Sequence, residues 1–134
     1  MARILLMDDE DALRAIMAEV LTEEGHEVVQ SATGKAATDP DTIRDVDLIV
    51  TDVIMPDVEG IEAIRVATRL RPDLPILAIS GGGRTVTSDY LPIARDLGAR
   101  DTLRKPFTPD ELVERVTALL GQMAEPARPS LPGT

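Results

Sequence analysis

The chain has 134 residues, a length typical of one domain, and its net charge of -10 comes from 24 acidic and 14 basic residues. This acidic excess argues against phosphate-backbone binding as the main activity, because nucleic-acid-binding proteins present a cationic surface. The sequence has no cysteine and one histidine. Disulfides, cysteine nucleophiles and two-histidine metal sites are therefore excluded. No apolar run is long enough to span a membrane, so we expect a cytoplasmic protein.

Short apolar runs, typical of buried strands, alternate along the chain with stretches of helical periodicity. Strands are predicted at residues 4–7, 26–30, 48–51, 75–79 and 102–104. The first is Ile4-Leu5-Leu6-Met7, and the acidic run that follows it supplies helix-starting residues.

Five helices are predicted between and after these strands. The first carries apolar residues at helical spacing up to Gly25, and a weak second helix over 35–44 is interrupted by Asp39-Pro40-Asp41. The third ends before Pro72, and the fourth is closed by Gly98. The last begins at Thr108-Pro109-Asp110-Glu111, which predicts a capping box.

Alternating strands and helices predict an α/β fold, with an open parallel sheet covered by helices on both faces. Right-handed crossovers place the carboxyl ends of all the strands at one edge of the sheet, where ligands bind in such folds. The residue types found at those ends therefore indicate the function.

Carboxylates, a hydroxyl and an ammonium follow the predicted strands. Asp8 and Asp9 end the first strand, Asp52 the third, Ser80 the fourth and Lys105 the fifth. Two like charges ~4 Å apart cost about 1 kcal/mol in water and about 4 kcal/mol at an effective dielectric constant of 20. A divalent cation would neutralise such a cluster, and oxygen-only ligands favour Mg²⁺. A carboxylate beside Mg²⁺, a lysine and a hydroxyl is suited to attack phosphorus.

The joint pattern resembles the receiver domain of bacterial two-component response regulators over about residues 2 to 122. The matching residues are Asp8-Asp9, Asp52 with Met55-Pro56-Asp57 and Gly60, Ser80-Gly81, and Lys105-Pro106-Phe107. The resemblance implies a flavodoxin-like (βα)5 fold with a doubly wound parallel sheet of strand order 2-1-3-4-5. It also implies a chemotaxis-regulator-like signalling domain, not an enzyme, with slow Mg²⁺-dependent self-phosphorylation and self-dephosphorylation.

The resemblance also assigns roles at the site. Asp52 corresponds to the phosphoacceptor, and Asp9, Asp52 and the backbone carbonyl of Ile54 correspond to the Mg²⁺ ligands, with Asp8 acting through water. Ser80 and Lys105 correspond to the groups that bind phosphoryl oxygens after transfer. Lys105-Pro106 is expected as a cis peptide, since X–Pro bonds adopt that form at a cost of only about 0.5–1 kcal/mol.

Two features depart from the family pattern. Thr102 stands three residues before Lys105, where the family usually has an aromatic switch residue. The segment between Ser80 and Gly98 is longer than usual and rich in glycine. We expect the loop over 81–88 to become ordered only when Asp52 is phosphorylated.

We expect a receiver domain at 1–122 and a disordered, proline-rich tail at 123–134, with no output domain following. The implied partners are a sensor histidine kinase or phosphotransfer protein, and a target docking on the fourth helix, fifth strand and fifth helix. Neither nucleic acid nor a membrane is expected as a partner. Two alternatives remain open. A haloacid-dehalogenase-like phosphohydrolase needs an acid where Ile54 stands, and a pseudo-receiver usually lacks an acid or the lysine, all of which are present here.

Overall fold

The computed structural model describes residues 2–53, 60–80 and 91–124, without the side chains of residues 91 and 122–124. Its centre is a parallel sheet of five strands in the order β2-β1-β3-β4-β5, which confirms the predicted topology. The strands are β1 (Arg3–Met7), β2 (Glu27–Ser31), β3 (Leu48–Asp52), β4 (Ile76–Ser80) and β5 (Asp101–Arg104). Each lies within one or two residues of its predicted position.

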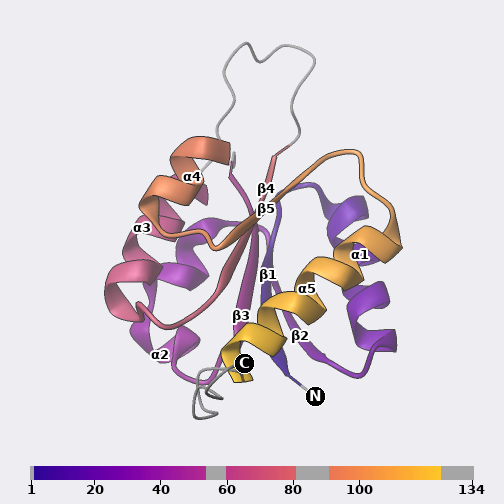
Figure 1. Ribbon diagram of the computed structural model, residues 1–134, viewed down its shortest axis with the longest axis horizontal. Helices are drawn as coiled ribbons and strands as arrows, with labels where there is room; N and C mark the ends of the chain where they lie inside the picture. Colours follow the sequence, from indigo (N-terminus) through magenta and orange to yellow (C-terminus); the bar gives the residue numbers. More distant parts are fainter. Residues whose placement is uncertain (1, 54–59, 81–90, 125–134) are drawn as a thin grey trace, which may run out of the picture.

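Helices cover both faces of the sheet (Figure 1). One face carries α1 (Asp11–Glu23) and α5 (Pro109–Ala124), and the other carries α2 (Pro40–Ile43), α3 (Gly60–Leu70) and α4 (Leu91–Leu97). The weak second helix is divided at Asp39, with a 3-10 turn, Gly34–Thr38, before it and α2 after it. Among the described residues, none of these helices is both long and apolar enough to cross a membrane.

The central strands are buried on both faces, as expected when helices lie on either side of a parallel sheet. Every residue of β3 and β4 is buried. Alternate side chains therefore enter different cores: Ile49 and Ile76 pack with α3 and α4, whereas Val50 and Leu77 pack with α1 and α5. This two-sided burial fixes the strand register, because a shift of one residue would exchange the two sets of side chains.

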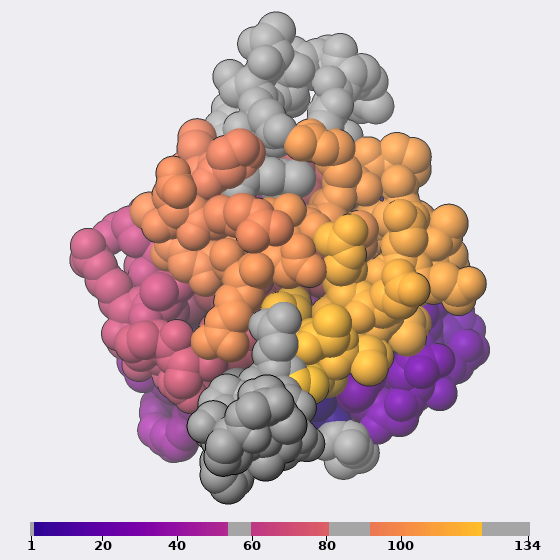
Figure 2. Space-filling model, in the orientation of Figure 1, coloured from indigo at the N-terminus to yellow at the C-terminus, as the bar shows by residue number. Residues whose placement is uncertain are grey.

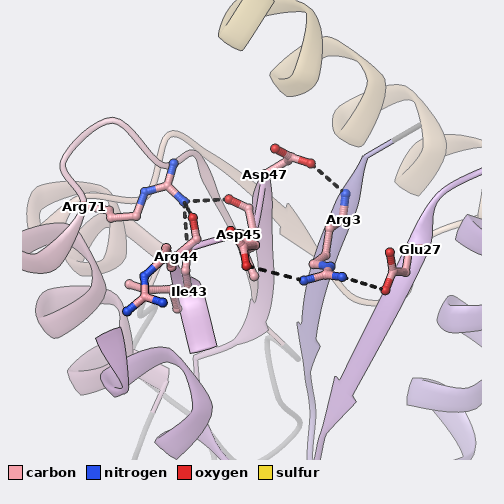
Figure 3. Close-up of polar contacts among 8 residues, drawn as sticks. Arg3, Glu27, Ile43, Arg44, Asp45, Asp47 and Arg71 are labelled. Atoms are coloured by element: carbon pink, nitrogen blue, oxygen red, sulfur yellow. Dashed lines mark hydrogen bonds and ion pairs between the residues drawn. The ribbon is translucent and has the colours of Figure 1, made fainter. Parts of the chain in front are cut away.

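Arginine side chains form hydrogen bonds and ion pairs that connect neighbouring segments at the edge of the sheet where the strands begin (Figure 3). The Arg71 guanidinium donates from Nη1 to the backbone carbonyls of Ile43, Arg44 and Val46, at 2.8, 3.2 and 2.7 Å. These carbonyls belong to the end of α2 and the segment that follows it, and Arg71 directly follows α3. Arg71 therefore ties α3 to the chain entering β3.

Arg3 makes a second set of polar contacts at the same edge. Its backbone N–H donates to Asp47 Oδ2 at 2.8 Å, and its guanidinium pairs with Glu27 at 3.1 Å and Asp45 at 4.0 Å (Figure 3). These contacts join β1 to the start of β2 and to the segment before β3.

The last helix begins as predicted and ends later than predicted. Thr108 N–H donates to Glu111 Oε1 at 2.8 Å, and Glu111 N–H donates to Thr108 Oγ1 at 3.1 Å, which forms the capping box. Helix α5 continues to Ala124, so residues 123 and 124 are helical, contrary to the tail predicted from 123. The rest of that tail, 125–134, lies outside the described residues.

Candidate functional site

The polar residues that follow the strands meet at the carboxyl edge of the sheet. The strand register sets this meeting: Met7 lies opposite Thr51, and Asp52 lies opposite Ile79. The Lys105 N–H donates to the Ser80 carbonyl at 2.8 Å, so the pairing of β4 with β5 delivers the lysine beside the serine. Residues 8, 52, 80 and 105 are thereby positioned by backbone pairing before any side-chain contact is considered.

Three carboxylates gather at this edge. One oxygen each from Asp8, Asp9 and Asp52 lies within 4.8 Å of the others, an arrangement that could hold a metal ion. Asp8 is fully buried and Asp52 is 7% exposed, whereas Asp9 is exposed. The site therefore combines two carboxylates inside the fold with one at its opening.

Lys105 places its ammonium among these carboxylates. Its Nζ lies 2.7 Å from Asp52 Oδ2, 3.4 Å from Asp8 Oδ2 and 3.7 Å from Glu10 Oε1. Burial alone would lower the pKa of Lys105, but the hydrogen bond and charge of Asp52, and then those of Asp8, raise the pKa above its ordinary value of 10.5. Lys105 is therefore a fixed positive charge beside Asp52.

Asp8 carries an unsatisfied acceptor that points into this cluster. Its Oδ1 accepts a hydrogen bond from the Glu10 N–H at 2.9 Å, which leaves Oδ2 buried with no hydrogen-bond partner among the described residues. Burial raises the pKa of Asp8 above 3.8; the Glu10 N–H and Lys105 oppose this rise, and the Asp52 charge adds to it. A buried acceptor without a hydrogen bond is costly, and the ion pair with Lys105 at 3.4 Å only partly compensates. This oxygen can therefore also accept a bound cation, directly or through water.

Gly60 lets the start of α3 approach the backbone of Asp52. A Cβ at position 60 would lie 1.8 Å from the Asp52 carbonyl oxygen and 2.6 Å from Val53 Cα. Both distances are far below van der Waals contact, so only glycine fits at this position. The packing of α3 therefore helps to fix the backbone that carries Asp52.

The structure brings together most of the predicted site. Asp8, Asp9, Asp52 and Lys105 are joined by the distances above, and Ser80 is buried at the end of β4, next to β5. Lys105-Pro106 is a cis peptide, as the resemblance implied. Ile54 and the loop over 81–88 lie outside the described residues.

Glu10 belongs to the site, although its sequence position indicated only a helix start. It is the N-cap residue of α1, yet its side chain makes no capping hydrogen bond and its carboxylate lies near Lys105. The only signal in the sequence was that Glu10 directly follows Asp8-Asp9.

The fold and this acidic, lysine-containing edge define a class: flavodoxin-like domains with a carboxylate pocket at the ends of the strands. A model of the response regulator receiver domain matches residues 4–117, and the chain belongs to this family. Receiver domains are signalling domains that interact with histidine kinases and downstream effectors. Neither the phosphohydrolase nor the pseudo-receiver alternative is favoured by this match.

Similar proteins are consistent with this assignment. The chain is 38% identical over 128 residues to the DNA-binding transcriptional regulator NtrC of Azospirillum brasilense, covering 94% of this chain and 26% of that protein. It is 38% identical over 129 residues to the transcriptional regulatory protein TcrA of Mycobacterium tuberculosis, covering 96% and 50%. A CheY-like response regulator receiver domain protein of Methanospirillum hungatei JF-1 superimposes with a TM-score of 0.79 at 26% identity, covering 92% and 97%. The chain thus spans half or less of these two curated relatives.

Proposed function

We propose that Asp52 is the phosphoacceptor of this receiver domain, taking a phosphoryl group from a histidine kinase or a phosphorelay protein. The main support is the position of the Asp52 carboxylate, which lies 2.7 Å from the Lys105 ammonium and within 4.8 Å of two further carboxylates. At 7% exposure, Asp52 is sheltered by the fold, yet the residue lies at the edge of the sheet where ligands bind.

The proposed step is an in-line displacement at phosphorus. An Asp52 carboxylate oxygen forms a bond to phosphorus while the phosphorus–nitrogen bond of the donor phosphohistidine breaks. The electron pair of the broken bond stays on the imidazole nitrogen, which leaves as neutral imidazole when the other ring nitrogen carries the proton. Positioning and electrostatic stabilisation supply most of the rate in such transfers, so a fixed ammonium beside Asp52 fits the reaction.

The donor set fits Mg²⁺. Asp9 and Asp52 would bind it directly with the backbone carbonyl of Ile54, and Asp8 would bind through water. All of these ligands are oxygens, and the buried Asp8 Oδ2, which has no hydrogen-bond partner, can accept a hydrogen bond from a cation-bound water molecule. When bound, Mg²⁺ would neutralise negative charge on the transferring phosphoryl group.

Lys105 and Ser80 would hold the phosphoryl group once it is on Asp52. Charge-assisted hydrogen bonds contribute about 1.5–3 kcal/mol each, and inverting a 1:99 conformational equilibrium takes ~5.5 kcal/mol of differential stabilisation. The bond from Ser80 to the phosphoryl group would be new, whereas Lys105 already pairs with Asp52 at 2.7 Å and would add only the difference between its two bonds. This is the energy available to switch partner binding.

We further expect slow self-phosphorylation by small phosphodonors and slow self-dephosphorylation, both dependent on Mg²⁺.

The face formed by α4, β5 and α5 is the proposed docking surface for a downstream protein. Helices α4 and α5 form much of the face seen in Figure 2. Asp101 on β5 links these helices, since its Oδ1 lies 3.2 Å from Arg95 of α4 and 3.4 Å from Arg115 of α5. Thr102, in the place of the usual aromatic residue, adjoins this linkage, so switching here would act through the charged contacts. We also propose a cytoplasmic location, because a kinase that donates the phosphoryl group would need ATP.

Incubation with acetyl phosphate and Mg²⁺, followed by intact mass spectrometry, separates the candidate functions. A single phosphoryl adduct that hydroxylamine removes, and that is absent without Mg²⁺, is the expected result. Turnover of many phosphoesters without an adduct would instead indicate a phosphohydrolase. A protein that binds Mg²⁺ but stays unmodified would indicate a pseudo-receiver.

A further inference from the structure

Lys105 and a divalent cation would need the same two carboxylates, those of Asp8 and Asp52. The ammonium lies 2.7 Å from Asp52 Oδ2 and 3.4 Å from Asp8 Oδ2, and both residues belong to the carboxylate cluster that could hold a metal. Two cations that share these carboxylates repel each other, and the repulsion is strong where the site is shielded from water. Binding of Mg²⁺ should therefore weaken the hold of Asp8 and Asp52 on Lys105.

Among the residues that the structure describes, Glu10 is the further carboxylate that pairs with this ammonium. Its Oε1 lies 3.7 Å from Lys105 Nζ, and it is outside the Asp8-Asp9-Asp52 cluster. The Glu10 side chain makes no capping bond at the start of α1 and is 63% exposed, so it can move toward the lysine at little cost.

The backbone of Glu10 fixes this arrangement. Its N–H donates to Asp8 Oδ1 at 2.9 Å, and this directs the other oxygen, Oδ2, toward Lys105, which lies 3.4 Å away. A single residue therefore orients one pocket carboxylate through its backbone and offers a second carboxylate to the ammonium through its side chain.

We propose that Glu10 is a positioning residue that retains the Lys105 ammonium when a divalent cation takes Asp8 and Asp52, and that it thereby strengthens cation binding. The inference rests on the cation site of the proposed function. It adds a specific role for a side chain that is not one of the three clustered carboxylates. The role requires Lys105, and this dependence can be tested.

Calorimetric titration of the full chain with Mg²⁺ tests the proposal in a double-mutant cycle of Glu10→Gln, Lys105→Met and the double variant. Glu10→Gln should weaken Mg²⁺ binding by about 1.4- to 5-fold, the range that corresponds to the contribution of exposed ion pairs. In the Lys105→Met background the same substitution should have a much smaller effect, because the ammonium that Glu10 retains is gone.

Asp11→Asn is the matched control. It removes the same charge one residue further along, from a carboxylate that pairs with Arg14 at 2.9 Å and has no contact with Lys105. An effect of Glu10→Gln no larger than that of Asp11→Asn, or one that persists undiminished without Lys105, would overturn the inference alone. A wild-type protein that binds no Mg²⁺ would overturn both the inference and the proposed function. Melting temperatures of all variants without Mg²⁺ verify that each is folded.

Discussion

At the scale of single residues, the most informative group is the fully buried carboxyl of Asp8. Asp8→Asn keeps an oxygen to accept the Glu10 N–H and replaces Oδ2, which has an ion pair with Lys105 but no hydrogen bond, with an uncharged amide group. The change removes a buried charge whose desolvation, together with repulsion by Asp52, outweighs its attraction to Lys105. This is a gain on the order of 1 kcal/mol, so the melting temperature without Mg²⁺ should rise by about 3–5 °C. Differential scanning calorimetry measures this, with Glu114→Gln on the exposed side of α5 as a control that should change little. A lower melting temperature for Asp8→Asn would contradict the account.

The same carboxyl predicts a pH dependence. Because the folded-state pKa of Asp8 is raised above 3.8, the native protein binds this proton more readily than the unfolded chain. The contribution of Asp8 to stability therefore falls as pH rises through the window above 3.8, and it is recovered as pH falls. The stability advantage of Asp8→Asn should thus widen between about pH 4 and pH 7 in calorimetry without Mg²⁺. A constant difference across this range would show that Asp8 is not perturbed by its surroundings.

The sequence was sufficient to predict which residue types lie together in the site. Residues that directly follow parallel strands lie at the carboxyl edge of the sheet, and the strands themselves were predictable. The sequence could not predict their burial: Asp8 and Asp9 are adjacent in the chain, yet one is fully buried and the other exposed. That difference depends on which way each side chain leaves the end of β1. The approach of Glu10 to Lys105 likewise depends on a side-chain conformation that no spacing rule encodes.

At the scale of elements, the contact between α3 and the end of β3 depends on Gly60. Gly60→Ala should destabilise the protein by about 1–3 kcal/mol or more, because its Cβ would lie 1.8 Å from the Asp52 carbonyl oxygen. Gly121→Ala on α5 is the control: a Cβ there meets nothing within 4 Å, and alanine should stabilise the helix by about 0.5–1 kcal/mol. Urea unfolding compares the two variants. Equal free energies of unfolding for the two variants would mean that α3 does not pack closely against the Asp52 backbone.

The link between α2, α3 and β3 depends on Arg71. Arg71→Met keeps part of the apolar stem but removes the donor shared by three carbonyls, so it should cost about 1.5–3 kcal/mol in urea unfolding. Arg44→Met removes an arginine that is 68% exposed and paired with Asp41, and should cost less than about 0.5 kcal/mol. If Arg71→Met lowers the free energy of unfolding as little as Arg44→Met does, the proposed stabilising role of Arg71 is contradicted.

Element boundaries were predicted closely where local chemistry sets them. The capping box at Thr108 and Glu111 formed, and Gly98, with φ of +135°, closes α4. The end of α5 was predicted less accurately: the tail was expected from residue 123, whereas the helix includes Gly121 and continues to Ala124. The hydrogen bonds of Arg71 could not be predicted from the sequence, because they join residues that are 25 to 28 positions apart.

At the scale of the whole molecule, the topology joins distant residues into one site. Asp52 and Lys105 are 53 residues apart in the chain, and they meet because β3, β4 and β5 lie side by side in parallel. Alternating apolar runs and helical stretches predicted this sheet, and the resemblance supplied the strand order. The net charge of -10 and the local excess of carboxylates over ammonium groups make the pocket favourable for a cation.

The central claim is that Asp52 accepts a phosphoryl group in a pocket that requires Mg²⁺. The most direct test is to treat the protein with acetyl phosphate and Mg²⁺, reduce it with borohydride, which converts an aspartyl phosphate to homoserine, and map the peptides. The account predicts homoserine at position 52, and none after chelation of Mg²⁺ or in Asp52→Asn. Homoserine at another acidic position, or the same yield at position 52 without Mg²⁺, would contradict it.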